Sequence, residues 1–250
     1  MKMKKLPAAL FACLSLAAPL GLAQGGPPLV TDDPETPGAG KWEINFAAIY
    51  ERTRAGRTEV ALPDIDMNYG WGDYIQLKLD VPWVYARESG ESWKAGLGKG
   101  DVGVKWRFVD EEKAGFSVST YPQYTWNILP SSAERGITDT TREFLLPIEI
   151  SKKVGDVGLD AEIGRNFVSH GSNQWVLGAI VAPKCGEKAE CLIEIHETLA
   201  PHEHQTLVNI GMRWKLAESM TLLAAVGREF GTVTDDQRHA LVYLGLQVVR

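Results

Sequence analysis

The chain has 250 residues, of which 44% are hydrophobic and 23% are charged, and its formal net charge is −6. Removal of an N-terminal export signal leaves 23 basic against 32 acidic residues, a net charge of −9 that argues against nucleic-acid binding. After the N-terminus, no apolar run approaches the ~20 residues that a membrane helix needs.

Residues 1–23 have the organisation of a secretory signal peptide. A basic start precedes an apolar stretch over residues 6–20, and Gly21 and Ala23 stand where a signal peptidase needs small residues. The alternative is a lipoprotein signal ending at Cys13, but apolar sequence continues well past that cysteine. We therefore expect export and cleavage after residue 23.

Residues 24–40 are rich in proline, glycine and aspartate. These residue types exclude the interior of a helix or strand, so the segment is predicted to be an extended periplasmic lead-in. The sequence leaves open whether it stays outside the domain that follows, caps it or enters it.

Residues 41–250 consist of segments in which apolar and polar residues alternate, as in Thr206 to Leu216. Period-two alternation over about ten residues is typical of a strand with one apolar and one polar face. Such strands, following an export signal, favour an all-β transmembrane antiparallel barrel with an apolar outside and a polar lumen. The predicted strands are 41–53, 57–70, 74–86, 100–109, 115–127, 141–152, 157–168, 174–183, 190–198, 206–216, 219–230 and 239–250.

The connections between these twelve segments alternate in length. Tight turns follow most even strands, whereas longer polar loops follow several odd ones, at 87–99, 128–140, 199–205 and 231–238. Short periplasmic turns opposite longer extracellular loops are typical of outer-membrane barrels. Prolines at 63, 82, 122 and 147 interrupt the pattern, because proline removes a ladder hydrogen bond.

Aromatic residues of the apolar parity gather near the two ends of the predicted strands. Trp42, Trp106 and Trp214 fall near the periplasmic ends, and Tyr124 and Trp126 are among those near the outer ends. Two aromatic belts are expected where a barrel crosses the two membrane interfaces. A soluble β-sandwich, the remaining alternative, gives no reason for this sorting.

The opposite parity collects charged and polar residues that are predicted to line the lumen. Because charges of both signs in a confined space must pair or stay hydrated, they predict either a narrow, acid-rich path or a network that fills the barrel. The predicted lining residues are Asp64, Asp66, Asn68, Lys78, Asp80, Asp101, Lys105, Arg107, Glu149, Asp160, Glu162, Glu194, His196, Asn209 and Arg213.

Three smaller features of the sequence suggest chemistry other than transport or a structural bond. His170 and Ser172 have the spacing of a histidine base and serine nucleophile in outer-membrane lipid hydrolases, but inward parity points them away from lipid. The histidines between 196 and 204 fit a solvated loop better than a metal site. Cys185 and Cys191 could form a disulfide across a turn in an oxidising periplasm. We expect no catalytic residues, no metal and no cofactor.

Several motifs resemble a family of outer-membrane transporters named for the MetA pathway of phenol degradation. The resemblance begins with Thr-Asp-Asp-Pro-Glu-Thr-Pro-Gly-x-Gly-x-Trp-Glu from Thr31, continues through segments 62–70, 79–83, 96–108 and 144–147, and ends with 243–247. It implies an outer-membrane barrel and passage of small hydrophobic or aromatic compounds, and it implies no catalytic residues.

The sequence therefore predicts a channel or passive transporter for small molecules in the outer membrane of a Gram-negative bacterium. Its expected partners are outer-membrane lipid, the barrel-assembly machinery and a small-molecule cargo. The alternatives are a membrane-embedded lipid hydrolase that uses His170 and Ser172 and a plugged structural barrel without transport.

Overall fold

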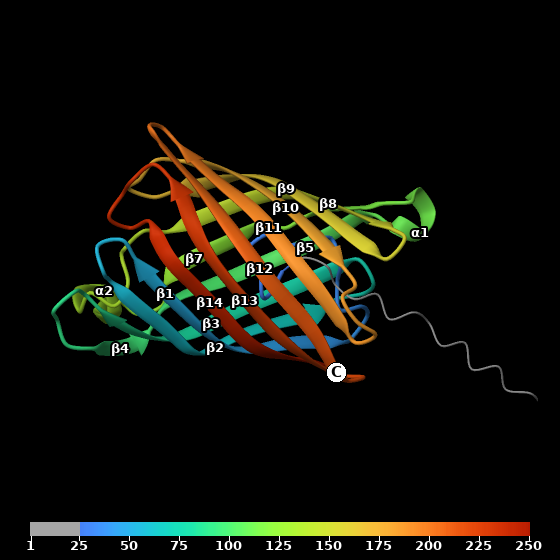
Figure 1. The fold of residues 1–250 in the computed structure, drawn as a ribbon, viewed down its shortest axis with the longest axis horizontal. Helices are drawn as coiled ribbons and strands as arrows, with labels where there is room; N and C mark the ends of the chain where they lie inside the picture. Colours follow the sequence, from blue (N-terminus) through green and yellow to red (C-terminus); the bar gives the residue numbers. More distant parts are fainter. Residues whose placement is uncertain (1–25) are drawn as a thin grey trace, which may run out of the picture.

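The computed structural model describes residues 26–250, which form one antiparallel sheet and two short helices (Figure 1). The predicted signal peptide, residues 1–23, lies outside the described residues. The helices are α1 (Glu111–Ala114) and α2 (Pro130–Glu134), and neither is long and apolar enough to cross a membrane. The strands are β1 (Trp42–Thr53), β2 (Thr58–Gly70), β3 (Ile75–Arg87), β4 (Lys94–Leu97), β5 (Lys99–Val109), β6 (Ser117–Thr120), β7 (Gln123–Asn127), β8 (Glu143–Val154), β9 (Val157–Val168), β10 (Gln174–Pro183), β11 (Ala189–Ala200), β12 (Glu203–Ala217), β13 (Met220–Gly231) and β14 (Arg238–Val249).

Two strands of the wall are interrupted, so that fourteen strands make a barrel of twelve. β4 and β5 both pair with β3 and are separated only by Gly98. β6 and β7 both pair with β5 and β8, and Tyr121 and Pro122 separate them. Pairing of β1 with β14 closes the sheet. The predicted fold, an all-β antiparallel barrel of about twelve strands, is confirmed.

All four prolines inside the predicted strands lie at irregularities of the ladder on at least one side. Pro63 lies where the pairing of β2 with β3 shifts register, between residues 61 and 64, and Pro122 lies in the break between β6 and β7. Both positions suit a residue that has no backbone N–H to donate. Pro82, opposite Asp64, lies at the edge of the same register shift and between the pairings of β3 with β4 and with β5. Pro147 is continuously paired with β9, but on its other side it lies opposite the break between β6 and β7.

The two ends of the barrel differ in their connections. At one end, here called the turn end, the chain reverses at residues 71–74, at α1, and at 155–156, 184–188 and 218–219. The opposite end, here called the loop end, carries α2 and β4. Figure 1 shows α1 and the C-terminus at the turn end and α2 at the far side of the barrel.

Two connections at the loop end are shorter than predicted. β4 occupies Lys94–Leu97 within the predicted loop 87–99. β11 and β12 remain paired as far as Ala200 and Glu203, so that only Pro201 and His202 turn within the predicted loop 199–205. In both places the backbone ladder continues beyond the apolar–polar alternation, because strand pairing needs hydrogen bonds but no apolar face.

The outside of the barrel is apolar. Large hydrophobic side chains alternate with buried inward residues along the strands, and the mid-strand residue Ile210 is 62% exposed. Aromatic residues also pair on this surface: Trp42 with Tyr69 at the turn end, with ring centroids 4.9 Å apart, and Tyr124 with Trp126 at the loop end, 6.1 Å apart. The outer surface thus has an apolar middle between two rims that carry aromatic side chains.

The N-terminal segment runs inside the barrel. It was predicted to be an extended lead-in, with its position left open, and the described part from Gly26 to Glu35 makes hydrogen bonds to inward side chains of β5, β9, β11 and β12. The chain leaves the lumen at the turn end, where the Gly40 N–H donates to the Gly70 carbonyl over 2.9 Å. The lead-in is therefore part of the lumen rather than an appendage to it.

An apolar outside predicts that a charge at mid-strand is far more costly in lipid than a charge at a rim. We expect Ile210→Arg to lower the free energy of unfolding in lipid vesicles by about 2–4 kcal/mol and Leu216→Arg, near the turn end of the same strand, by about 0–1 kcal/mol. Urea titration of the two variants in vesicles measures the difference. Equal losses would contradict a lipid-facing outer surface.

Candidate functional site

The fifteen residues predicted to line the lumen all lie on the inner face of the wall, where they alternate with exposed outward residues. Four of them, Lys78, Asp80, Asp101 and Arg107, are half-buried. The other eleven are buried: Asp64, Asp66, Asn68, Lys105, Glu149, Asp160, Glu162, Glu194, His196, Asn209 and Arg213. Their role in any transport is a separate question from this placement.

Residues 26–36, here called the inserted segment, enter this lumen as a loop that is deepest near Thr31. The buried Glu194 carboxylate accepts hydrogen bonds from the backbone N–H groups of Val30, over 3.1 Å, and Thr31, over 2.5 Å. The Asn209 amide donates to the same carboxylate over 2.7 Å. Hydrogen bonds to a buried carboxylate are among the stronger ones, so Glu194 fixes the tip of the segment.

Three cations of the wall hold the rest of the inserted segment. The Lys105 ammonium lies 2.8 Å from the Asp32 carboxylate and also donates to the Asp33 carbonyl. The Arg107 guanidinium lies 2.5 Å from the Glu35 carboxylate. The Arg213 guanidinium donates to the carbonyls of Gly26, over 3.2 Å, and Pro27, over 3.0 Å. Each contact joins residues that are far apart in the sequence.

The charge of Asp32 depends on this pairing. Burial by itself raises the pKa of the Asp32 carboxyl, but attraction to the Lys105 ammonium and the hydrogen bond between them outweigh that effect, so its pKa lies below the usual value. The pair is therefore ionised, and neither partner can be removed without leaving the other charge buried.

Apolar packing and a close backbone approach complete the fit of the segment. Leu29 is buried in a cluster with Ile180, Leu192 and Leu223 of the inner wall. Beside Thr31 the wall has Gly178, and a Cβ at that position would lie only 2.2 Å from the Thr31 hydroxyl oxygen. A glycine is needed there because a larger residue would occupy the place of the Thr31 side chain.

Acidic residues dominate the lumen beside the inserted segment. Asp64, Asp66 and Asp80 lie on paired positions of β2 and β3, where Asp66 is opposite Asp80, and Asp80 is in turn opposite Asp101 of β5. The Lys78 ammonium lies 3.5 Å from the Asp101 carboxylate. Because carboxylates outnumber cations here, this part of the lumen favours positive charge and needs hydration.

A cavity of about 630 Å³ opens beyond this acidic cluster at the loop end. Asp64 belongs both to the acidic cluster and to the cavity lining, so the two adjoin each other. Ile49, Val84 and Ile137 contribute apolar surface to the lining. Seven acidic and three basic residues line it, so its charge is also negative: Glu51, Glu59, Asp64, Glu88, Glu91, Asp139 and Asp236 against Arg57, Lys94 and Lys99.

The catalytic alternative gains no geometric support. His170 and Ser172 are both exposed at the loop end, and no hydrogen bond joins them in the described part of the chain. The histidine sites considered for metal are separated as well: His196 is buried against Thr31, whereas His204 pairs with Glu197 over 3.3 Å at the exposed end of the strands. Within residues 26–250, no cluster of three or more His, Cys, Asp or Glu side chains is arranged to hold a metal ion.

The two cysteines among the described residues lie at the turn end. Cys185 and Cys191 are joined by a disulfide that closes the β10–β11 hairpin. The bridge lies apart from the acidic part of the lumen and tethers a turn, where it limits the freedom of the unfolded chain.

Sequence reasoning missed several charged residues of the lumen. Glu190 pairs with Arg213 over 3.4 Å, and Arg238 bridges Glu229, over 2.6 Å, and Glu51, over 3.2 Å. These residues lie near the ends of their strands, where the apolar–polar alternation is least reliable for predicting which side chains face the lumen. The contacts of the inserted segment with the wall could not be predicted, because residues 26–36 are not a strand and have no apolar–polar alternation.

Comparison with known proteins identifies the fold. The sequence matches no protein-family profile and no curated protein. The structure is similar to the crystal structure of an outer membrane channel from Pseudomonas putida F1, with a TM-score of 0.68 and 11% identity over 89% of this chain and 99% of that chain. It also resembles the NanC porin, with a TM-score of 0.57 and 8% identity over 82% of this chain and 98% of the porin. A KdgM porin, solved in complex with disordered oligogalacturonate, has the same TM-score and coverage at 10% identity. The chain thus has the fold of outer-membrane channels.

The close approach at Gly178 predicts that a single methyl group displaces the inserted segment. Overpacking of this kind costs about 1–3 kcal/mol, so Gly178→Ala is expected to raise the rate of amide hydrogen exchange in residues 26–36 about tenfold or more. The double variant with Thr31→Gly removes the side-chain atoms that the methyl meets and is expected to restore protection. Unchanged exchange in Gly178→Ala would show that the segment does not depend on this contact.

Proposed function

We propose that the protein is a channel of the bacterial outer membrane in which the inserted segment closes the turn end of the lumen. The observation that carries this proposal is a polar, acid-rich lumen that holds an open cavity at one end and a charge-anchored loop at the other. The apolar outside and the fold of outer-membrane channels support the location. The alternative of a lipid hydrolase lacks support from the described residues 26–250, in which no hydrogen bond joins His170 to Ser172.

The inserted segment has the properties of a removable closure rather than of a permanent core. Most of its anchors are hydrogen bonds and ion pairs, which water and free ions can replace once the segment leaves. Leu29 is its one buried hydrophobic side chain in the wall's apolar cluster. A permanently plugged structural barrel is the second candidate, and the occupied lumen itself favours it.

The charge of the lumen supports preference for cationic or neutral cargo. Acidic residues at Asp64, Asp66, Asp80 and around the loop-end cavity create a negative potential along the path. An anionic sugar polymer, such as the oligogalacturonate bound by the KdgM porin, would be disfavoured here. Apolar surface from Ile49 and Val84 beside these carboxylates suits a small molecule that carries a nonpolar part.

The resemblance of the sequence to the transporter family named for the MetA pathway supports a narrower cargo, small hydrophobic or aromatic compounds. The motif from Thr31 to Glu43 that carries this resemblance includes the anchors Asp32 and Glu35. The motif is therefore accounted for by the fit of the inserted segment in the lumen, independently of the cargo.

Neutralising the two carboxylates of the inserted segment is expected to open the channel. In Asp32→Asn with Glu35→Gln, the ion pairs to Lys105 and Arg107 are lost. Removing one partner of a buried pair costs about 3–5 kcal/mol, which is an upper bound here because Asp32 and Glu35 are partly exposed. Planar-bilayer recording should show brief, rare openings of the mature protein and long openings of the double variant. Glu88→Gln, which affects an exposed pair with Arg57, is the matched control. If both proteins stay silent although correctly folded, the structural barrel is the better account.

Charge substitution at the loop-end cavity tests the proposed selectivity. Asp64→Asn combined with Asp236→Lys lowers the negative charge of the lining, so the ratio of cation to anion permeability is expected to fall several-fold. The reversal potential in a KCl gradient measures this ratio. Glu187→Lys is the control, because it makes the same change of charge as Asp236→Lys but on an exposed turn at the turn end of the barrel. It should leave the permeability ratio unchanged. Equal ratios in all three proteins would contradict selection by this cavity.

A further inference from the structure

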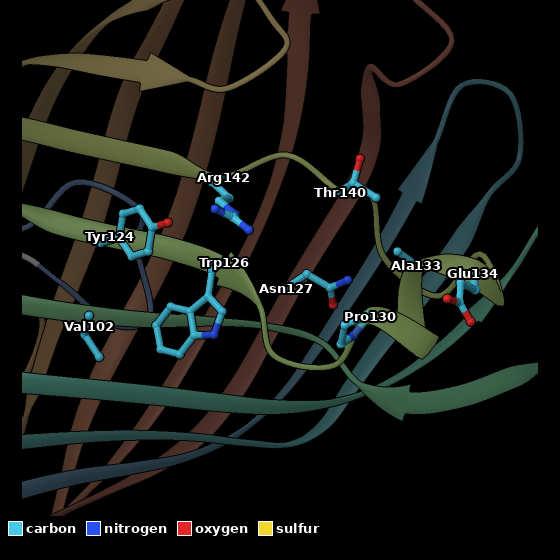
Figure 2. Close-up of a pocket in the computed structure, with 9 residues that line it drawn as sticks. All are labelled: Val102, Tyr124, Trp126, Asn127, Pro130, Ala133, Glu134, Thr140 and Arg142. Atoms are coloured by element: carbon cyan, nitrogen blue, oxygen red, sulfur yellow. The ribbon is translucent and has the colours of Figure 1, made fainter.

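A groove of about 660 Å³ lies on the outside of the barrel at the loop end (Figure 2). One side is the barrel wall at β5 and β7, and the other side is α2 with the chain that leads from it to β8. Its lining residues are Val102, Tyr124, Trp126, Asn127, Pro130, Ala133, Glu134, Thr140 and Arg142. This groove is separate from the lumen, because Val102, Tyr124 and Trp126 have the outward parity of their strands.

The groove lies at the level of the aromatic rim of the loop end. Tyr124 and Trp126 stack with their planes 14° apart, and Tyr124 lies beside Phe144 on the next strand. Such aromatic rims mark the boundary between hydrocarbon and headgroups in membrane barrels. Since Val102 continues the apolar outer surface into the groove, a lipid chain can enter from the bilayer without crossing polar surface.

Arg142 gives the groove an available positive charge. Three other outward arginines near this end stack on rings: Arg87 over Trp93 at 4.7 Å, Arg165 over Trp175 at 5.1 Å and Arg228 over Phe230 at 5.6 Å. In the part of the chain that the structure describes, the exposed Arg142 guanidinium has no hydrogen bond, ion pair or ring contact. Figure 2 shows Arg142 next to Tyr124 and Trp126, with Glu134 at the opposite end of the groove on α2.

We propose that this groove binds one phosphate-bearing membrane lipid. A lipid chain lies along Val102, Tyr124 and Trp126, and the lipid phosphate pairs with Arg142, whose planar guanidinium suits phosphate oxygens. The charge and the continuity with the lipid-facing surface select this occupant, since a purely apolar compound leaves Arg142 without a partner. The inference rests on the membrane location in the proposed function but not on conductance.

The test is retention of phosphatidylglycerol by the detergent-purified, full-length mature barrel, measured by native mass spectrometry. We expect one tightly held copy on the unsubstituted protein and about a tenfold weaker affinity in Arg142→Gln, or ~1.4 kcal/mol. Arg228→Gln removes an arginine that stacks on a ring in the same rim and should stay within twofold of the unsubstituted protein. Arg142→Lys, which keeps the charge but loses the planar fork, should fall between the two.

Diacylglycerol, which has the chains without the phosphate, and inorganic phosphate, which has no chains, complete the experiment. Weak binding of both supports the proposal. Equal binding of diacylglycerol and phosphatidylglycerol, or equal losses in Arg142→Gln and Arg228→Gln, would overturn it. Vesicle flotation of each variant reports membrane insertion independently, so failure of the lipid site is distinguishable from failure of the proposed membrane location.

Discussion

Closure of the sheet by pairing of β1 with β14 is the constraint on which the rest of the structure depends. A closed sheet gives each strand one face that is turned outward and one that is enclosed, so period-two alternation sorts every side chain. The outward set is apolar and suits lipid, and the enclosed set carries the charge. Charges that are enclosed in this way must be paired or hydrated, and this requirement gives the inserted segment its role.

The inserted segment supplies opposite charges and backbone groups where the wall alone lacks them. Lys105 and Arg107 have their carboxylate partners Asp32 and Glu35 in the segment, while Glu194 receives backbone N–H groups from it. The acidic cluster around Asp80 and the loop-end cavity have no such filling by the segment, so one barrel contains an occupied half and an open half. Under the proposed function, this division lets one lumen favour cations in its open half and be closed in its occupied half.

The sequence predicted the elements that depend on local pattern. The alternation of apolar and polar residues over 206–216 correctly predicted a strand there. On other strands, the same kind of alternation correctly predicted that Asp66, Lys105 and Glu194 face inward. It could not predict contacts such as that of Thr31 with Glu194, because these join residues that are 163 positions apart and follow from barrel closure alone. The sequence predicted a loop over residues 199–205, whereas only Pro201 and His202 form the turn. The prediction was too long because the strands stay paired beyond the point where the apolar–polar alternation ends. The external groove depends on how α2 folds back over the wall, and no periodic signal reports that arrangement.

The most direct test of the account locks the inserted segment in place. A Cβ at Gly178 would lie 2.8 Å from the Cβ of Thr31, so the inserted segment has to move outward by about 1 Å to reach the ~3.8 Å between the Cβ atoms of a disulfide. A Gly178→Cys, Thr31→Cys double variant forms the crosslink once the segment has moved by that amount. Single-channel current is then recorded before and after reduction. Thr31→Cys alone, which keeps Gly178, is the control for the effect of reducing the Cys185–Cys191 bridge. The account predicts a silent barrel when oxidised and a conducting one when reduced. Equal conductance in both states would contradict closure of the lumen by this segment.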